Sequence, residues 1–147
     1  MIKKFLILLF LATTVKAQTI SPVINEFGKK ASGEFTVTNN GLQPLAVAVR
    51  AFSFTVVDGK SIFRPLDAGV TVSINTTSTR LGPKQSFTFD YDVRCASLPC
   101  AITIDVSLTG LHTITGLAVA LHLPEVIYLC DKAKGCRDRI RKAREVK

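Results

Sequence analysis

Two runs of alternating apolar and polar residues, joined by a cluster of turn-forming residues, lie between positions 31 and 49. The apolar residues recur at every second position on both sides of the turn, at Phe35, Val37, Leu45, Val47 and Val49. A period of two is typical of antiparallel strands with one buried face, and the Asn-Asn-Gly sequence at 39–41 is typical of a turn. We interpret the segment as a hairpin in the core of an all-β domain.

Residues 1–17 predict export. Lys3 and Lys4 precede an apolar run at 5–12, and Val15-Lys16-Ala17 offers small or tolerated residues for cleavage. This order is typical of a secretory signal peptide, and the run is shorter than the roughly 20 apolar residues that span a bilayer. We therefore expect residues 1–17 to be a signal peptide, and the mature chain to be periplasmic or secreted.

Residues 18–130 form the predicted domain, which is long enough to bury one hydrophobic core. Short apolar runs alternate with turn signals, and no helical period occurs before residue 131. We expect strands at 20–24, 33–38, 45–57, 61–63, 71–79, 86–93, 101–108 and 117–129. Seven to eight antiparallel strands at this spacing predict an immunoglobulin-like β-sandwich. The lack of Trp and of widely spaced cysteines argues against a true antibody domain.

The net charge of +8 is divided between the signal segment, which carries three lysines and no acidic residue, and the end of the chain. Residues 18–130 carry eight basic and eight acidic side chains, whereas residues 131–147 carry eight basic and three acidic ones. A short basic C-terminal tail of this kind is most often solvated and mobile, and the other interpretation is contact with an acidic partner or a membrane surface. Because the domain itself is neutral, we do not expect nucleic-acid binding.

The four cysteines form two close pairs, Cys95 with Cys100 and Cys130 with Cys136. An even number of cysteines in an exported chain predicts disulfides, and four cysteines allow three pairings. Proximity favours the two local pairs. The first would close a hairpin turn, and the second would join the tail to the end of the last strand. Neither pair has the two-residue spacing of a typical zinc or redox site, so we expect no metal.

No pattern in the chain predicts catalysis. The sequence contains neither a Gly-x-Ser-x-Gly nucleophile turn nor a phosphate-binding glycine loop, and His112 and His122 are ten residues apart. Asp90 and Asp92 alternate on one strand face, where we interpret them as an exposed rim. We therefore expect no enzyme, no cofactor and no small-molecule substrate.

Five segments carry a resemblance to a known family: Ser-Pro at 21–22, Gly-Glu-Phe-Thr-Val-Thr-Asn at 33–39, Pro-Leu-Ala-Val at 44–47, Leu-Gly-Pro-Lys-Gln-Ser at 81–86 and Gly-Leu-Ala-Val-Ala-Leu at 116–121. Their order and spacing resemble the N-terminal immunoglobulin-like domain of the PapD-like periplasmic chaperones, which assemble pili and fimbriae. The resemblance covers nearly all of residues 20–129.

The resemblance implies a chaperone-like module that caps a strand-deficient pilus or envelope subunit by β-strand addition, in which the last strand inserts alternate apolar side chains into the subunit. The matching residues are Leu117, Val119, Leu121 and Leu123. The opposite face, with Ala118, Ala120 and His122, could donate instead, or the leucine face could fill the core of this domain. The alternative function is a stand-alone immunoglobulin-like structural or adhesion domain of the cell envelope.

The chain departs from this family at the anchor for the subunit's terminal carboxylate. The family places an Arg in the first strand and a Lys at the end of the last strand, in a cleft between two domains. Here the matching regions are 20–24 and Pro124-Glu125, which contain no basic residue, and we expect no second domain. Lys29, Lys30 and Arg50 are the nearest basic residues, and each is expected to face solvent.

Overall fold

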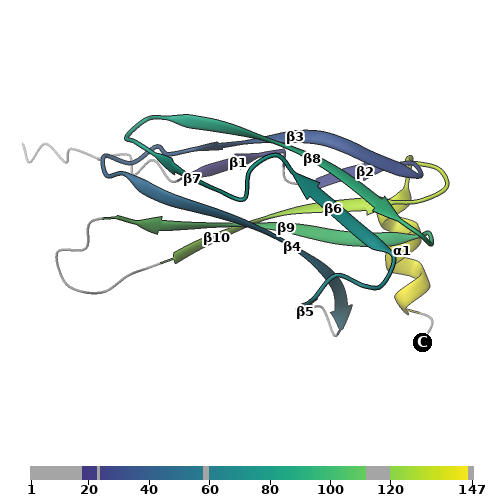
Figure 1. Ribbon diagram of the computed structural model, residues 1–147. Helices are drawn as coiled ribbons and strands as arrows, with labels where there is room; N and C mark the ends of the chain where they lie inside the picture. The colour runs from purple at the N-terminus through teal and green to yellow at the C-terminus, as the bar shows by residue number, and fades with distance from the viewer. Residues whose placement is uncertain (1–17, 23, 58–59, 112–119, 146–147) are drawn as a thin grey trace, which may run out of the picture.

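The computed structural model describes residues 18–22, 24–57, 60–111 and 120–145, with only the backbone described at residue 56 and residues 141–145. Within these described residues, ten strands form two packed sheets, and one helix follows them. Figure 1 shows the two layers, with the helix at one end. The four-stranded sheet has the order β1 (Thr19–Ser21), β3 (Lys30–Thr38), β8 (Ser86–Cys95) and β6 (Val70–Ile74). The six-stranded sheet has the order β2 (Ile24–Phe27), β10 (Ala120–Leu129), β9 (Cys100–Gly110), β4 (Leu45–Val57) and β5 (Lys60–Arg64), with β7 (Ser78–Leu81) also paired to β4. The predicted immunoglobulin-like sandwich is confirmed.

Two expected strands are each divided between the sheets, which gives ten strands in place of seven or eight. The strand expected at 20–24 is interrupted at Pro22, so β1 joins the four-stranded sheet and β2 joins the six-stranded sheet. Proline has no N–H for a strand ladder, and it therefore favours such a break. The strand expected at 71–79 divides at Asn75 into β6 and β7. The prediction of a wholly antiparallel fold was also wrong, because β2 pairs with β10 in parallel.

The interpretation of residues 31–49 as a hairpin was wrong. β3 pairs with β1 and β8, whereas β4 pairs with β9, β5 and β7 in the opposite sheet. Phe35 and Val47 do face the same core, since both are buried in the main hydrophobic cluster. They approach it from opposite sheets, because alternation specifies the buried face of a strand and leaves its neighbour open.

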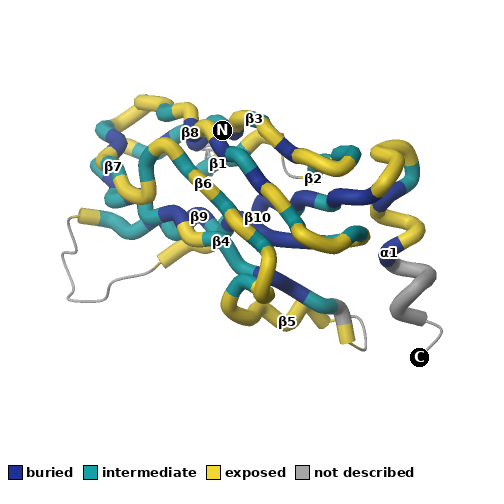
Figure 2. Tube along the Cα trace, turned by 45° about the vertical axis from the view of Figure 1, so that its right-hand side comes forward, coloured by how far each residue is buried: buried dark blue, intermediate teal, exposed yellow. Residues whose placement is uncertain are grey.

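The core lies between the two sheets. Phe35 stacks on Phe89 with ring centroids 5.1 Å apart, and both rings are fully buried. Inward residues of β9 and β10 close the core from the other sheet, and the largest fully buried ones are Ile102, Ile104, Ile127 and Leu129. Each such side chain contributes about 1.5–3 kcal/mol through burial, so this core accounts for much of the stability of the sandwich. Figure 2 shows that β5, in contrast, is exposed along its length.

Asn39 joins two turns at one end of the sandwich. Its buried side-chain amide donates to the carbonyl oxygens of Gln43, Leu81 and Gly82 at 2.8, 3.2 and 3.0 Å. Its Oδ1 accepts a hydrogen bond from the Gly41 N–H at 3.0 Å. The buried amide of Asn39 is thus fully hydrogen-bonded, as buried polar groups require, and it joins the turn after β3 to the turn after β7.

The helix α1 (Cys136–Glu145) lies at the opposite end of the sandwich from the β3–β4 turn and runs away from both sheets (Figure 1). Cys136 and Ile140 are buried in a second hydrophobic cluster with Phe54, Ala101 and Cys130. This cluster lies on the outer face of the six-stranded sheet. Cys136 and Ile140 therefore pack against the sheet, which the sequence did not predict. The basic side chains of Lys132, Lys134, Arg137 and Arg139 are exposed, as expected of a solvated segment.

Both predicted disulfides are confirmed. Cys95–Cys100 closes the connection between β8 and β9, and Cys130–Cys136 joins the end of β10 to the start of α1. A disulfide restricts the unfolded chain, although loops this short limit the effect.

Candidate functional site

One edge of β10 is open over part of its length. β10 pairs with β9 along its whole length, but on its other side only residues 126–129 pair, with β2. No strand in the described part of the chain pairs with residues 120–125 on that side. Unpaired backbone groups on an edge strand are a template for another strand, so this edge is the candidate interaction site.

The register with β9 shows which backbone groups face the open edge. It is continuous along β10, so the strand contains no bulge and its N–H groups alternate regularly between the two sides. Cys130 donates its N–H to the Phe27 carbonyl of β2 at 3.2 Å, which places even-numbered N–H groups on the β2 side. Ala120 and His122 therefore present N–H and C=O groups to the open edge. Pro124 presents only its C=O, since proline has no N–H.

Leu121 and Leu123, two of the four predicted partner-binding residues, belong to the face of β10 that points into the sandwich. Leu123 is partly buried and packs against the main core, whereas Leu121 is 40% exposed near the open end of the strand. Leu117 and Val119 lie outside the described residues. The structure thus shows Leu123 contributing to the core of its own domain, and partner binding through these side chains stays a prediction.

Glu125 is a carboxylate buried between the sheets. Asn25 of β2 donates from Nδ2 to Glu125 Oε1 at 2.8 Å, while Oε2 is buried without a hydrogen-bond partner among the described residues. Burial raises the pKa of Glu125 to about 7, and the hydrogen bond from Asn25 opposes part of this rise. Burial and the charge of Glu125 together raise the pKa of the nearby Tyr91. The strand pattern contained one signal for this group, a carboxylate within an otherwise apolar run.

Gly33 leaves room for the side chain of Tyr91, which lies beside Asn25 and Glu125. It lies opposite Tyr91 in the β3–β8 register, and a Cβ atom at position 33 would lie 2.7 Å from the Tyr91 hydroxyl oxygen. That hydroxyl also accepts a hydrogen bond from Asn25 Nδ2 at 3.3 Å. The contact with Asn25 therefore requires a residue without a side chain at position 33.

The outer face of β9 and β10 carries Asp105, Ser107 and His122. His122 Nδ1 lies 2.8 Å from Asp105 Oδ2 and 3.1 Å from Ser107 Oγ. In a catalytic Ser-His-Asp triad, the carboxylate and the hydroxyl bind different nitrogens of the imidazole. Here both bind Nδ1, so the three residues do not form a catalytic triad.

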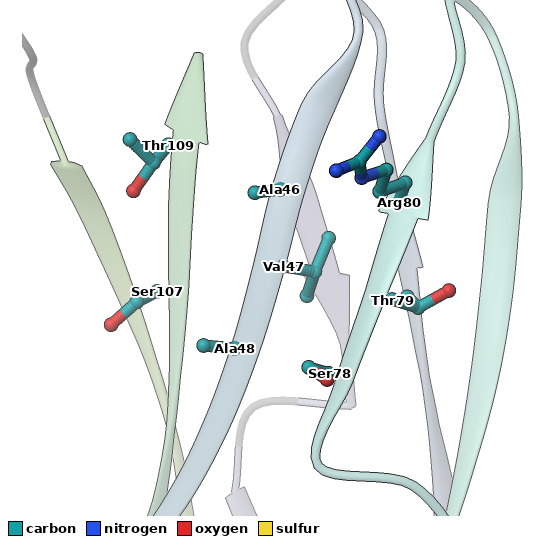
Figure 3. A pocket seen from close by; sticks show the side chains of 8 residues that line it. All are labelled: Ala46, Val47, Ala48, Ser78, Thr79, Arg80, Ser107 and Thr109. Atoms are coloured by element: carbon teal, nitrogen blue, oxygen red, sulfur yellow. The ribbon is translucent and has the colours of Figure 1, made fainter. Parts of the chain in front are cut away.

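A shallow trough of about 330 Å³ crosses the outer face of β7, β4 and β9. Figure 3 shows its lining residues: Ala46, Val47, Ala48, Ser78, Thr79, Arg80, Ser107 and Thr109. The small side chains of β4 form its floor, and none of its polar side chains is buried. A second depression of about 420 Å³, lined mainly by apolar residues, opens between the edges of β4 and β6. Both are surface depressions and not enclosed pockets.

The remaining candidate residues have ordinary surroundings. Asp92 accepts a hydrogen bond from Ser32 at 2.7 Å and forms ion pairs with Lys30 and Arg94, and the Ser32 hydrogen bond is the largest cause of its lowered pKa. Within the described ranges, no group of three or more His, Cys, Asp or Glu residues could bind a metal ion. No helix in the same part of the chain is long and apolar enough to cross a membrane.

No protein-family model and no curated protein matches this sequence. Among solved structures, the chain is similar to the E. coli chaperone DraB, with a TM-score of 0.58, 16% identity, and coverage of 80% of this chain and 56% of that one. It is also similar to a chain of the Salmonella enterica SafA pilin–SafB chaperone complex, with a TM-score of 0.55, 14% identity, and coverage of 83% and 58%.

A third similar structure is SSP-19, an MSP-domain protein like family member from Caenorhabditis elegans. Its TM-score is 0.54 at 12% identity, with coverage of 76% of this chain and 98% of that one. The chain thus spans little more than half the length of DraB and of the matched chain in the SafA–SafB complex, and it covers nearly all of SSP-19. At these identities the likeness shows the fold alone, which is a PapD-like immunoglobulin-like sandwich.

Proposed function

We propose that this protein is an exported, non-enzymatic binding module that captures a strand-deficient pilus or envelope protein by β-strand addition. The observation that carries the proposal is the open edge of β10 at residues 120–125, on a sandwich similar to those of pilus chaperones. A partner strand would pair with the N–H and C=O groups of Ala120 and His122.

Exposed apolar side chains at the same end of the sandwich as residues 120–125 support this proposal. Leu121 is 40% exposed and lies opposite Leu108 near the end of β9. Leu111 follows β9 and is 39% exposed, and its N–H donates to the Pro44 carbonyl in the β3–β4 turn. Leu42, in the same turn, is 79% exposed. Large apolar side chains that gather at one end of a domain favour a protein contact there.

The proposed binding differs from the family pattern at the carboxylate anchor. Asn25 and the buried Glu125 contact each other near the positions where the family has its basic pair. Lys30, one of the nearest basic residues, lies in the four-stranded sheet and forms an ion pair with Asp92 of the same sheet. We therefore propose that backbone pairing and apolar contacts bind the partner, without capture of its terminal carboxylate.

Two further parts of the proposal concern the setting of the protein. Its two disulfides favour an oxidising compartment such as the periplasm or the cell exterior. The basic residues of the segment 131–147 would favour contact with an acidic partner or an anionic membrane surface, in addition to binding at β10.

A proline substitution tests strand addition directly. His122→Pro removes an N–H that faces the open edge and keeps the ladder to β9, as the native Pro124 does. The matched control is His122→Ala, which loses the same imidazole and keeps the N–H. With tagged protein and envelope extract, we expect wild type and His122→Ala to form a one-to-one complex with the same protein, and His122→Pro to lose it.

The capture results can be compared only if wild type, His122→Pro and His122→Ala are all folded. Circular dichroism and melting curves of all three proteins should show the same cooperative sandwich. Equal capture by the two folded variants would contradict pairing at this edge. Leu121→Asp tests the apolar contribution in the same assay, and we expect weaker capture by this variant.

The second candidate function is a structural or adhesion domain of the envelope. The packing of Leu123 against its own core favours it, because that leucine is then not available for insertion into a partner. A structural domain should self-associate or stay with the envelope fraction, whereas a chaperone should form a reversible one-to-one complex. Analytical ultracentrifugation of the purified protein, alone and with its captured partner, distinguishes the two.

A further inference from the structure

β2 covers part of the same edge of β10 that is open elsewhere. It has four residues, and it pairs in parallel with residues 126–129. Phe27 packs partly buried against the main core, whereas Ile24 is 44% exposed. A strand this short, with little buried side-chain area, gains limited stability from its own pairing and packing.

Glu26 of β2 binds the start of α1. Its Oε2 accepts the Gly135 N–H at 3.1 Å, and its Oε1 accepts the Arg137 N–H at 3.2 Å. The first N–H groups of a helix have no partner within the helix and carry the positive end of its dipole, so a carboxylate stabilises them well. The contact thus ties an edge strand to a helix more than 100 residues further along the chain.

α1 is itself fixed to the sheet. Cys136 is joined by a disulfide to Cys130 at the end of β10, and both residues are buried. Ile140, one turn further on, is buried in the same cluster against Phe54 and Ala101. A ten-residue helix is marginal in isolation, so these contacts determine its position.

We propose that α1 is a clamp that holds β2 on β10 and thereby ends the docking edge of β10 at Pro124. Two independent features coincide there. Pro124 has no N–H for a partner strand, and β2 occupies the edge from Val126 onward. A partner strand must then stop at Pro124, whereas release of β2 would extend the open edge through Leu129. The functional role of this clamp rests on the proposed strand addition, but the experiment that tests the clamp needs no partner protein.

Amide hydrogen exchange measures whether α1 holds β2. In Glu26→Ala, we expect the amides of β2 and those of Val126 and Tyr128, which face it, to exchange about tenfold or more faster than in wild type, because two charge-assisted hydrogen bonds are lost. The matched control is Glu34→Ala on β3, which removes an exposed carboxylate of the other sheet. We expect it to leave these rates unchanged.

A second pair of variants tests the disulfide that joins α1 to the end of β10. Cys130→Ser/Cys136→Ser should also speed exchange in β2 and in α1, while Cys95→Ser/Cys100→Ser should leave β2 protected. The proposal is overturned if β2 exchanges at the wild-type rate in both Glu26→Ala and Cys130→Ser/Cys136→Ser. It is equally overturned if exchange rises to the same extent in all strands, since that pattern reports global destabilisation. Failure of partner capture in the His122→Pro experiment would leave these rates unaffected.

Discussion

Asn25 of β2 donates a 2.8 Å hydrogen bond to the buried carboxylate of Glu125 in β10, across a separation of 100 residues in the chain. The bond joins β2, which covers residues 126–129 of the β10 edge, to Glu125, the last residue before the covered part. A buried acid with one oxygen unpartnered among the described residues is costly when ionised. The protonation of Glu125 is therefore coupled to the stability of this edge.

Glu125→Gln should change the pH dependence of stability. The folded-state pKa of Glu125, about 7, is above the ordinary 4.5, so the folded protein binds this proton more tightly than the unfolded chain. The free energy of unfolding should then fall as the pH rises from 4.5 to 7, by up to about 3 kcal/mol. Urea titrations of Glu125→Gln should lack this fall and show the variant more stable than wild type at pH 8. A parallel fall in both proteins would contradict the assignment, and Glu34→Gln is the control.

Pro124→Ala should increase self-association of the protein through the open edge of β10. The substitution adds an N–H on the open side of the strand, which extends the ladder available to another chain. We expect concentration-dependent self-association by light scattering, at protein concentrations where wild type is unchanged. The exposed Pro83, in the turn before β8, provides the control Pro83→Ala. If both variants behave alike, the missing N–H at position 124 has no effect on association.

Ile140→Ala should destabilise α1 selectively. The substitution removes a buried side chain and costs about 2–4 kcal/mol, more than a helix of this length contributes by itself. We expect faster hydrogen exchange in residues 136–145 and less helical signal, while the β8–β9 core keeps its protection. The control is Arg137→Ala at an exposed position on the same helix. Unchanged exchange in α1 would show that the disulfide alone positions the helix.

Asn39→Ala should lower the free energy of unfolding by about 2–4 kcal/mol. It removes the amide that serves three carbonyl groups, and buried carbonyls without partners are costly. Denaturant unfolding measures the change. Gln43→Ala, at an exposed position in the same turn, should change stability by less than about 0.5 kcal/mol. Similar effects of the two substitutions would mean that turn conformation, and not the amide network, is responsible.

Much of the sandwich could be predicted from local patterns. β4 has the predicted bounds, 45–57, and the apolar positions on both sides of the first turn face the core as expected. The disulfide pairs followed from proximity along the chain. These features depend on residues near one another in sequence, where alternation and short loops restrict the choices.

Partner strands were less predictable. The residues around Phe35 and Val47 read as a hairpin, although β3 and β4 lie in opposite sheets. Both arrangements bury the same faces, so alternation cannot distinguish them. The breaks at Pro22 and Asn75 were not predicted, because the transfer of the chain to the other sheet depends on how the two layers pack.

At the candidate site, too, local features could be predicted from the sequence and contacts between distant residues could not. The family resemblance implied an interaction through the last strand, in which the sequence has Pro124 and Glu125. The hydrogen bonds of Glu125 with Asn25 and of Glu26 with the start of α1, in contrast, join residues about 100 positions apart. By itself, the sequence determined which strand faces are apolar and where the charge lies, and it favoured the two local cysteine pairs that the structure shows, because these are local properties. Only the tertiary structure decided which edge of β10 is covered and which is open, because that depends on strands that meet across the whole chain.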